Sequence, residues 1–189
     1  MAKGLDPQIV NPILTKFIEE TVTSKGGLVS SKAFDIATKP IEVYEGRLRV
    51  YSSDKFEVPT YVAAANLYLN QGDMRAHRSR GVMVIYMDIE VADKIFKAAG
   101  LQVPFDEDDG SMEELCGNFC QSIANNLKER LIEEGFISLE VSPSIVYKNA
   151  ITEGVEFSKD QNEKQEISFY FLKHKALVID WTLAPIPKK

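Results

Sequence analysis

The chain has 189 residues, of which 44% are hydrophobic and 26% charged, so it is predicted to bury one sizeable core and to fold as a single domain over residues 1–189. A net charge of −6 argues against nucleic acid as a partner, because such binding needs clustered Lys and Arg. No apolar run approaches the roughly 20 residues of a membrane span, and the first residues lack the apolar stretch of a signal peptide. We therefore expect a cytoplasmic protein that has no contact with a membrane.

The first predicted helix follows two helix-opening pairs, Asp6-Pro7 and Asn11-Pro12, in which a capping side chain precedes a Pro. Apolar residues then recur at helical spacing, and Gly26-Gly27 ends the segment. The stripe consists of Ile9, Val10, Ile13, Leu14, Phe17, Ile18 and Val22. The polar side carries no distinctive pattern, so we interpret this helix as scaffold.

The next part of the chain is predicted to form strands. Residues 41–44 and 47–51 alternate like two short strands around Glu45-Gly46. Residues 61–70 and 81–87 are rich in β-branched and aromatic side chains, which predicts a hairpin with a polar arm between its strands. The tip of this hairpin carries a basic cluster, formed by Arg75, His77, Arg78 and Arg80. These side chains can bind an anionic surface or can be ordinary solvated turn residues, and the latter is the simpler interpretation.

A short helix follows, capped by Asp88 and closed by Gly100. Its inner face consists of Val91, Ala92, Ile95 and Phe96. Residues 103–110 form an acidic linker that leads into a second long helix. The acidic residues of this linker lack the alternate spacing of a Ca²⁺ loop, and carboxylates ahead of a helix already suit its dipole.

Residues 111–135 are predicted to form an amphipathic helix. Ser111 and Glu114 have the spacing of a capping box, and Gly135 suits the left-handed stop. One side is an apolar stripe of Met112, Leu115, Cys116, Phe119, Ile123, Leu127 and Leu131, which predicts a core face. The other side carries a polar ridge, formed by Glu114, Asn118, Gln121 and Asn125.

The polar ridge is informative because Asn is a poor helix former and is a less natural filler of a solvated face than Lys or Glu. A carboxamide donates and accepts hydrogen bonds without titrating, which suits it to positioning a water molecule. On spacing alone, however, an ordinary solvated face is the simpler interpretation of these residues.

The two cysteines, Cys116 and Cys120, lie four residues apart on the predicted helix. A disulfide in that geometry is improbable. A metal site would need two further ligands, and His77 and His174 are each isolated in the sequence, so we predict no metal site. A nucleophilic role is disfavoured because neither thiol has a nearby His in the sequence. We expect two buried structural thiols.

After the helix, strands are predicted at residues 136–141, 165–172 and 176–183, and residues 152–164 are predicted to form a polar turn or hairpin arm. Helices that alternate with turn-linked strands indicate an α+β domain in which long helices pack on an antiparallel sheet. The two halves of the chain share the order of a helix followed by a hairpin. Residues 168–172 are apolar enough that an exposed edge there would pair with another chain, which predicts a homodimer.

Three segments resemble the CheC/CheX class of chemotaxis phosphatases, and the likeness covers residues 8–183. In that class a helix carries Glu-x-x-Asn, and a strand with a Pro-containing end follows about two dozen residues later. The matching segments are Glu-Glu-Leu-Cys-Gly-Asn ending at Asn118, then Glu134-Gly135 with Ser142-Pro143-Ser144-Ile145-Val146, and Val10-Asn11-Pro12 near the N-terminus. The resemblance implies a CheC/CheX-like fold built from two related halves, and it also favours a homodimer.

The resemblance also implies an activity, which is dephosphorylation of the aspartyl-phosphate of a CheY-like response regulator. The partner supplies the phosphoryl group and Mg²⁺, so the phosphatase needs no cofactor of its own. Asn118 would orient the attacking water, and Glu114 would anchor the partner. The neighbouring Gln121, Ser122 and Asn125 would contact the partner as well.

The chain departs from the family pattern at one position. When Asn118 is aligned with the family's Asn, the family's Glu falls on Leu115, and Glu114 lies four residues before Asn118 instead of three. The alternative is therefore a binding or dimerisation module of the same fold that lacks phosphatase chemistry.

Overall fold

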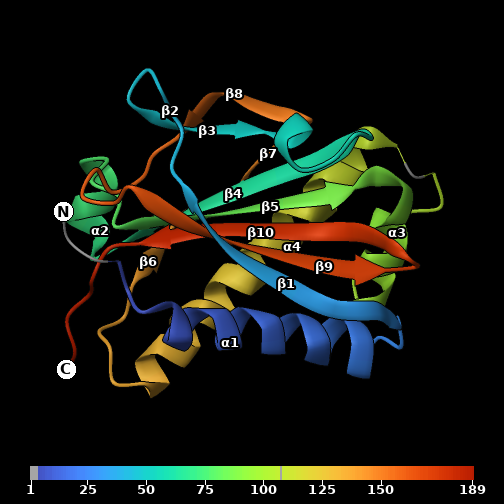
Figure 1. Ribbon diagram of the computed structural model, residues 1–189, viewed down its shortest axis with the longest axis horizontal. Helices are drawn as coiled ribbons and strands as arrows, with labels where there is room; N and C mark the ends of the chain where they lie inside the picture. The colour runs from blue at the N-terminus through green and yellow to red at the C-terminus, as the bar shows by residue number, and fades with distance from the viewer. Residues whose placement is uncertain (1–3, 107) are drawn as a thin grey trace.

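The computed structural model describes residues 4–106 and 108–189. A seven-stranded sheet forms the middle of the molecule (Figure 1). Its strands are β1 (Ser30–Pro40), β4 (Thr60–Tyr68), β5 (Gly81–Asp88), β6 (Glu140–Val141), β7 (Ile145–Lys148), β9 (Glu163–Phe171) and β10 (His174–Leu183). The order is β1-β9-β10-β5-β4, and β6 and β7 both pair with β4. Each of these pairings is antiparallel, which confirms the predicted α+β fold class.

The helices lie on and around one face of this sheet. They are α1 (Pro7–Ile18), which continues as the π-helix η1 (Glu19–Ser24), then α2 (Gln71–Arg75), α3 (Ile89–Ala98) and α4 (Asp109–Glu133). The inward side chains of α1, α3 and α4 share one core with alternate residues of the central strands. The apolar stripes of both long helices thus bury against the sheet, which is the main stabilising contact in the fold.

A small second sheet covers part of the opposite face. It consists of β2 (Val43–Tyr44), β3 (Arg47–Tyr51) and β8 (Ala150–Val155), and the 3₁₀ turn η2 (Ser52–Asp54) follows β3. Figure 1 shows this sheet and α1 on opposite sides of the central strands. Its residues Leu48 and Val50 pack on Tyr86 and Val178 in a separate, smaller core.

The two halves of the chain are related through the central pair, β5 and β10. The strand after α1, β1, pairs with β9 of the second half, and the strands after α4, β6 and β7, pair with β4 of the first half. Each half therefore contributes one long helix, one edge and two inner strands. The predicted helix-then-hairpin order of both halves is confirmed.

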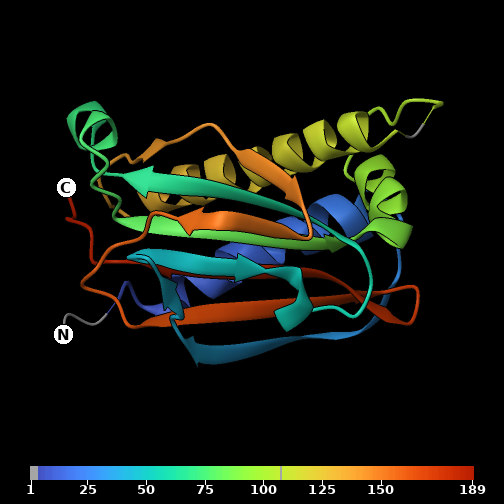
Figure 2. The ribbon, with the colours of Figure 1, turned by 90° about the horizontal axis from the view of Figure 1, so that it is seen from above.

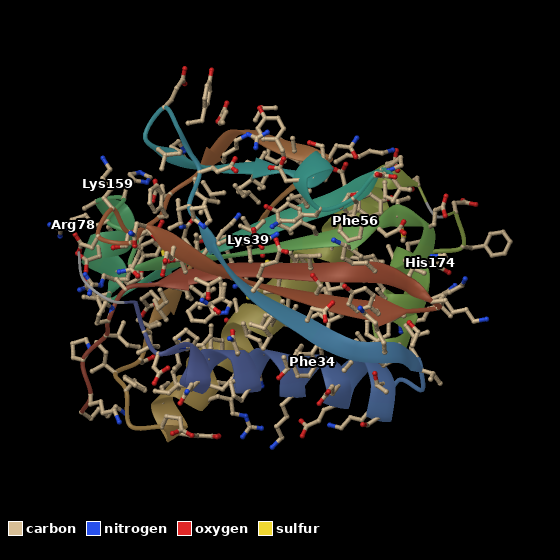
Figure 3. The ribbon with its side chains drawn as sticks, in the orientation of Figure 1. Phe34, Lys39, Phe56, Arg78, Lys159 and His174 are labelled. Carbon is tan, nitrogen blue, oxygen red and sulfur yellow. The ribbon has the colours of Figure 1, made fainter. Side chains whose placement is uncertain are left out.

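A buried charge network joins the loop before β4 to the main sheet. The Lys55 ammonium contacts the Glu166 carboxylate and lies 3.0 Å from Asp180 Oδ1. Lys39 and Lys164 complete the network at 2.7 Å from Glu166 and 2.6 Å from Asp180, respectively (Figure 3 labels Lys39). Burial alone would lower the pKa of Lys55, but the two carboxylates outweigh it and raise that pKa.

Several predicted strands differ from the structure. The long strand β1 was missed because most of its side chains are exposed and polar, as suits an edge strand. Of residues 136–141, only β6 is a strand, and part of the predicted polar arm forms β8. Residues 168–172 do not form an edge, because β9 pairs with β1 on one side and with β10 on the other.

The first helix opens at only one of its two predicted starts. Asp6 Oδ1 accepts a hydrogen bond from the Gln8 backbone N–H at 2.9 Å, so Asp6 is the cap. Pro12 lies inside α1, where its missing N–H cannot contribute a helical hydrogen bond. Asn11 caps nothing, because its side chain is buried and bonded to the sheet: Trp181 Nε1–H donates to Asn11 Oδ1 at 2.8 Å.

Candidate functional site on helix α4

Helix α4 begins at a different cap from the predicted one. Asp108 Oδ1 accepts the Ser111 backbone N–H at 2.8 Å, and the Ser111 hydroxyl donates to Asp108 Oδ2 at 3.1 Å. These bonds lower the pKa of Asp108, with the backbone N–H of Ser111 as the largest cause. The predicted capping box of Ser111 and Glu114 is wrong, because Asp108 is the N-cap residue and Ser111 lies inside the first turn of the helix. Glu114 is therefore exposed and is not engaged as a cap.

The first residue of α4 is tied to two strands. Asp109 Oδ1 accepts the Tyr61 hydroxyl of β4 at 3.1 Å, and its Oδ2 lies 2.9 Å from the Lys148 ammonium of β7. Both contacts favour the carboxylate, so the pKa of Asp109 is lowered, most of all by Lys148. The start of the helix is thereby held against the edge of the sheet.

The middle of α4 packs against β7, and Figure 2 shows the two elements side by side. A Cβ on Gly117 would come within 2.7 Å of Val146 Cγ2, so any larger residue would require the Val146 side chain or the strand to shift. The Ser144 hydroxyl lies 3.0 Å from the Gly117 carbonyl oxygen and 3.0 Å from Gln121 Oε1. The Pro-containing segment between β6 and β7 is thus fastened to the helix beside Asn118. Sequence reasoning missed Gly117, although its place before Asn118 was a signal.

The structure brings most of the predicted site residues onto one exposed ridge of α4. Glu114, Asn118, Ser122 and Asn125 all lie on the solvent side. The Ser122 hydroxyl donates to the Asn118 backbone carbonyl at 3.0 Å, which leaves the Asn118 side chain to the solvent. Gln121 differs from the others, because it is half-buried at the border with β7 and bonded to Ser144. We call the four exposed residues together with Gln121 the α4 ridge.

Leu115, at the position of the family's Glu, lies on the other border of the α4 ridge. It is half-buried and packs against the main core. An aliphatic side chain there cannot form a charged contact with a partner. The only carboxylate of the α4 ridge is that of Glu114, which is exposed and one turn before Asn118.

Both thiols are buried, as predicted, and both are free. Burial raises the pKa of Cys116 well above its ordinary value and raises that of Cys120 to about 12. A protonated thiol is a poor nucleophile, so the structure gives neither cysteine a reactive environment.

Three members of the basic cluster at the hairpin tip, His77, Arg78 and Arg80, contact other residues of the chain. His77 Nδ1 lies 2.7 Å from Glu156 Oε1, and Arg78 lies 2.8 Å from Asp73. The Arg80 guanidinium donates to the backbone carbonyl of Pro185. Figure 3 shows Arg78 beside α2, at the end of the molecule opposite to His174. These contacts favour a structural role for the cluster.

Two kinds of feature were not found within residues 4–106 and 108–189. No group of three or more His, Cys, Asp or Glu side chains is arranged so that it could hold a metal ion. No helix in this part of the chain is long and apolar enough to cross a membrane.

The comparisons with known proteins find relatives by structure but not by sequence. No protein-family model matches the chain, and no curated protein matches it. A CheC-like superfamily protein from Shewanella sp. PV-4 aligns with a TM-score of 0.58 at 12% identity, covering 96% of this chain and 100% of the other. The chemotaxis protein CheX from Desulfovibrio desulfuricans aligns with a TM-score of 0.55 at 13% identity, covering 93% and 99%.

A further structural relative is a complex. The structure of the CheX–CheY–BeF₃–Mg²⁺ complex from Borrelia burgdorferi aligns with a TM-score of 0.55 at 13% identity, covering 97% of this chain and 100% of the other. Identities this low establish the fold and leave the activity open. The resemblance found in the sequence is thus confirmed at the level of fold: the chain has the fold of the CheC- and CheX-like chemotaxis proteins over nearly its whole length.

Proposed function

We propose that the protein is a phosphatase for the aspartyl-phosphate of a CheY-like response regulator in chemotaxis or related two-component signalling. The observation that carries the proposal is the exposed carboxamide of Asn118 in the middle of α4, on a CheX-like fold. The complex of a structurally similar CheX with CheY supports the choice of partner.

In the proposed reaction, the α4 ridge docks on the phosphorylated site of the regulator. The oxygen of the Asn118 carboxamide accepts a hydrogen bond from one water molecule and holds the water oxygen in line with the phosphorus. The new bond forms between that oxygen and the phosphorus, and the bond from the phosphorus to the aspartyl oxygen breaks. The products are inorganic phosphate and the free aspartate of the regulator. This is catalysis by positioning, as in other phosphoryl hydrolyses.

The α4 ridge carries no positive charge, so in the proposed reaction the partner supplies the positive charge that stabilises the transition state. The five side chains of the α4 ridge include one carboxylate, Glu114, and no cation. A phosphoryl group needs positive charge to stabilise its transition state, so the proposed regulator supplies Mg²⁺ at its own site. Glu114 then contacts a cationic or hydrogen-bonding group of the regulator and serves as the anchor.

The alternative function is a binding or dimerisation module of a signalling pathway, and the observation that favours it is Leu115. Its half-buried aliphatic side chain replaces the family's Glu at three residues before Asn118. A module of this kind would bind the regulator through the α4 ridge without hastening loss of its phosphate.

The deciding experiment mixes the purified protein with a phosphorylated CheY-like regulator and follows the decay of the phosphoryl group. We expect decay to accelerate in proportion to the amount of protein. Binding without acceleration would favour the module, and Leu115→Glu is then the informative variant because it creates Glu-x-x-Asn. Absence of both binding and acceleration with every regulator tested would overturn both functions.

We also propose a homodimer in the cytoplasm. The two strands at the edges of the described sheet are β1 and the broken strand of β6 and β7, so pairing between chains would use one of these edges in place of residues 168–172. Light scattering at micromolar protein is expected to give the mass of a dimer, and a strictly monomeric mass would contradict it.

A further inference from the structure

The segment between β6 and β7 points one hydroxyl at the α4 ridge. Pro143 interrupts the edge strand, and Ser144 follows it with a half-buried side chain. Its Oγ lies 3.0 Å from two acceptors on α4, which are the Gly117 carbonyl oxygen and Gln121 Oε1. The close approach of Val146 to Gly117 holds the strand in this position.

The contact with Ser144 holds the Gln121 amide in one position beside Asn118. A carboxamide has an oxygen that accepts and an NH₂ that donates, and the two ends lie on opposite sides of the same carbon. The Ser144 hydroxyl has one hydrogen and two neighbouring acceptors, the Gly117 carbonyl oxygen and Gln121 Oε1, so it can donate to Gln121 or donate to Gly117 and accept from Gln121. In both arrangements one end of the Gln121 amide is bonded to Ser144 and the other end is turned outward. Gln121 follows Asn118 by three residues and is therefore its neighbour on the helix surface.

We propose that Ser144 is a positioning residue, which holds the Gln121 side chain so that the outward end of its amide forms a hydrogen bond with the bound regulator. The inference rests on the proposed function and names a determinant of affinity within it. Asn118 acts on the water, whereas the oriented Gln121 holds the partner. The effect of Ser144 therefore falls on binding more than on turnover.

The test compares Ser144→Ala, Ser144→Thr, Gln121→Ala and the double variant Ser144→Ala/Gln121→Ala in the dephosphorylation assay. We expect Ser144→Ala to raise KM about fivefold, the usual size of one hydrogen bond, with kcat nearly unchanged. Thr keeps the hydroxyl and is expected to restore KM. In the double variant, KM is expected to equal that of Gln121→Ala, because Ser144 acts through Gln121.

A matched control and a second measurement separate orientation from general damage. Ser142→Ala changes the other serine of the segment, whose Oγ accepts the Asn66 backbone N–H at 2.9 Å and does not contact Gln121. It is expected to lower thermal stability without raising KM. In NMR spectra of the free protein, the side-chain NH₂ signals of Gln121 are expected to become more mobile in Ser144→Ala and to stay unchanged in Ser142→Ala.

The outcomes distinguish the inference from the proposed function. An active wild-type protein whose KM is the same in Ser144→Ala would overturn the inference alone. Additive effects of Ser144→Ala and Gln121→Ala would also overturn it, because the two residues would then act separately. A wild-type protein that neither binds nor dephosphorylates any regulator overturns the proposed function, and the inference falls with it.

Discussion

The two long helices place the same residue type in opposite roles. Asn11 of α1 is 7% exposed, accepts the Trp181 Nε1–H and donates from Nδ2 to Gln165 Oε1 at 3.5 Å. Asn118 of α4 is exposed, and its carboxamide has no hydrogen-bond partner within residues 4–106 and 108–189. At both positions an Asn inside the helix is less favourable for helix formation than an Ala would be. One of them stabilises the fold with its amide, and the other leaves its amide free for a partner.

The largest expected effect is on the exposed amide. Asn118→Ala removes a group that we propose acts only in the transition state, so turnover is expected to fall roughly a hundredfold, as when one preorganised polar group is lost. Affinity for the regulator is expected to change little. Asn126→Ala, on the same helix but outside the α4 ridge, is the matched control and is expected to keep wild-type turnover. Wild-type turnover in the Asn118 variant as well would remove Asn118 from the mechanism.

The buried amide of α1 is expected to show the reverse behaviour. Asn11→Ala leaves the Trp181 N–H and the Gln165 carbonyl without their partner, which is expected to lower the free energy of unfolding by about 1–3 kcal/mol. Activity per folded molecule is expected to stay at the wild-type level. The measurements are a denaturant titration and the phosphatase assay. A variant as stable as the wild type would contradict the role assigned to this amide.

A smaller effect separates the cap of α4 from its ridge. Asp108→Ala removes the side chain that accepts the Ser111 N–H, so the melting temperature is expected to fall by about 2–4 °C. Glu114→Ala is expected to leave the melting temperature unchanged and to weaken binding of the regulator. Calorimetry and a binding titration check the pair. A lower melting temperature in Glu114→Ala would instead support a capping role for Glu114.

The smallest expected effect is at the two thiols. Cys116 and Cys120 are fully buried and their pKa values are raised, so at neutral pH the thiols are protonated and reaction of the folded protein with a thiol reagent is expected to be slow. Replacing both residues with Ala is expected to change activity by less than about twofold. Fast labelling of the native protein together with loss of activity would reverse this assignment.

Sequence periodicity predicted the elements whose buried faces are regular. The stripe of α4 is confirmed, because burial of one side of a helix forces a repeat into the sequence. The strands β4, β5 and β10 are buried on both faces, and their runs of apolar, β-branched and aromatic residues identified them without a repeat. The edge strand β1 was not predicted, because neither of its faces is buried and its sequence therefore needs no alternation of apolar and polar residues. The cap of α4 was misplaced because Asp108 and Ser111 both suit the position, and only the hydrogen bonds decide between them.

The candidate site was only partly predictable. The resemblance to a family pointed to Asn118, and the spacing placed Glu114 and Asn125 on the same face of the helix. The partners of Gly117 and Gln121 are Val146 on β7 and Ser144 just before it, more than 20 residues away in the sequence, so no local pattern reports them. For the same reason, the sequence could not show that Asn11 is bonded to Trp181, which is 170 residues away.

The buried charge network constrains the order in which the domain assembles. The Lys55 side chain is only 4% exposed, and the two carboxylates that it contacts, Glu166 and Asp180, belong to β9 and β10. Without both carboxylates, the free energy lost when the ammonium group is dehydrated would exceed the free energy gained from its ion pairs. The loop that carries Lys55 is therefore expected to dock only after β9 and β10 have paired, so that β2, β3 and β8 close over a sheet already formed. Pulse-labelling hydrogen exchange during refolding would show this as late protection of the small sheet.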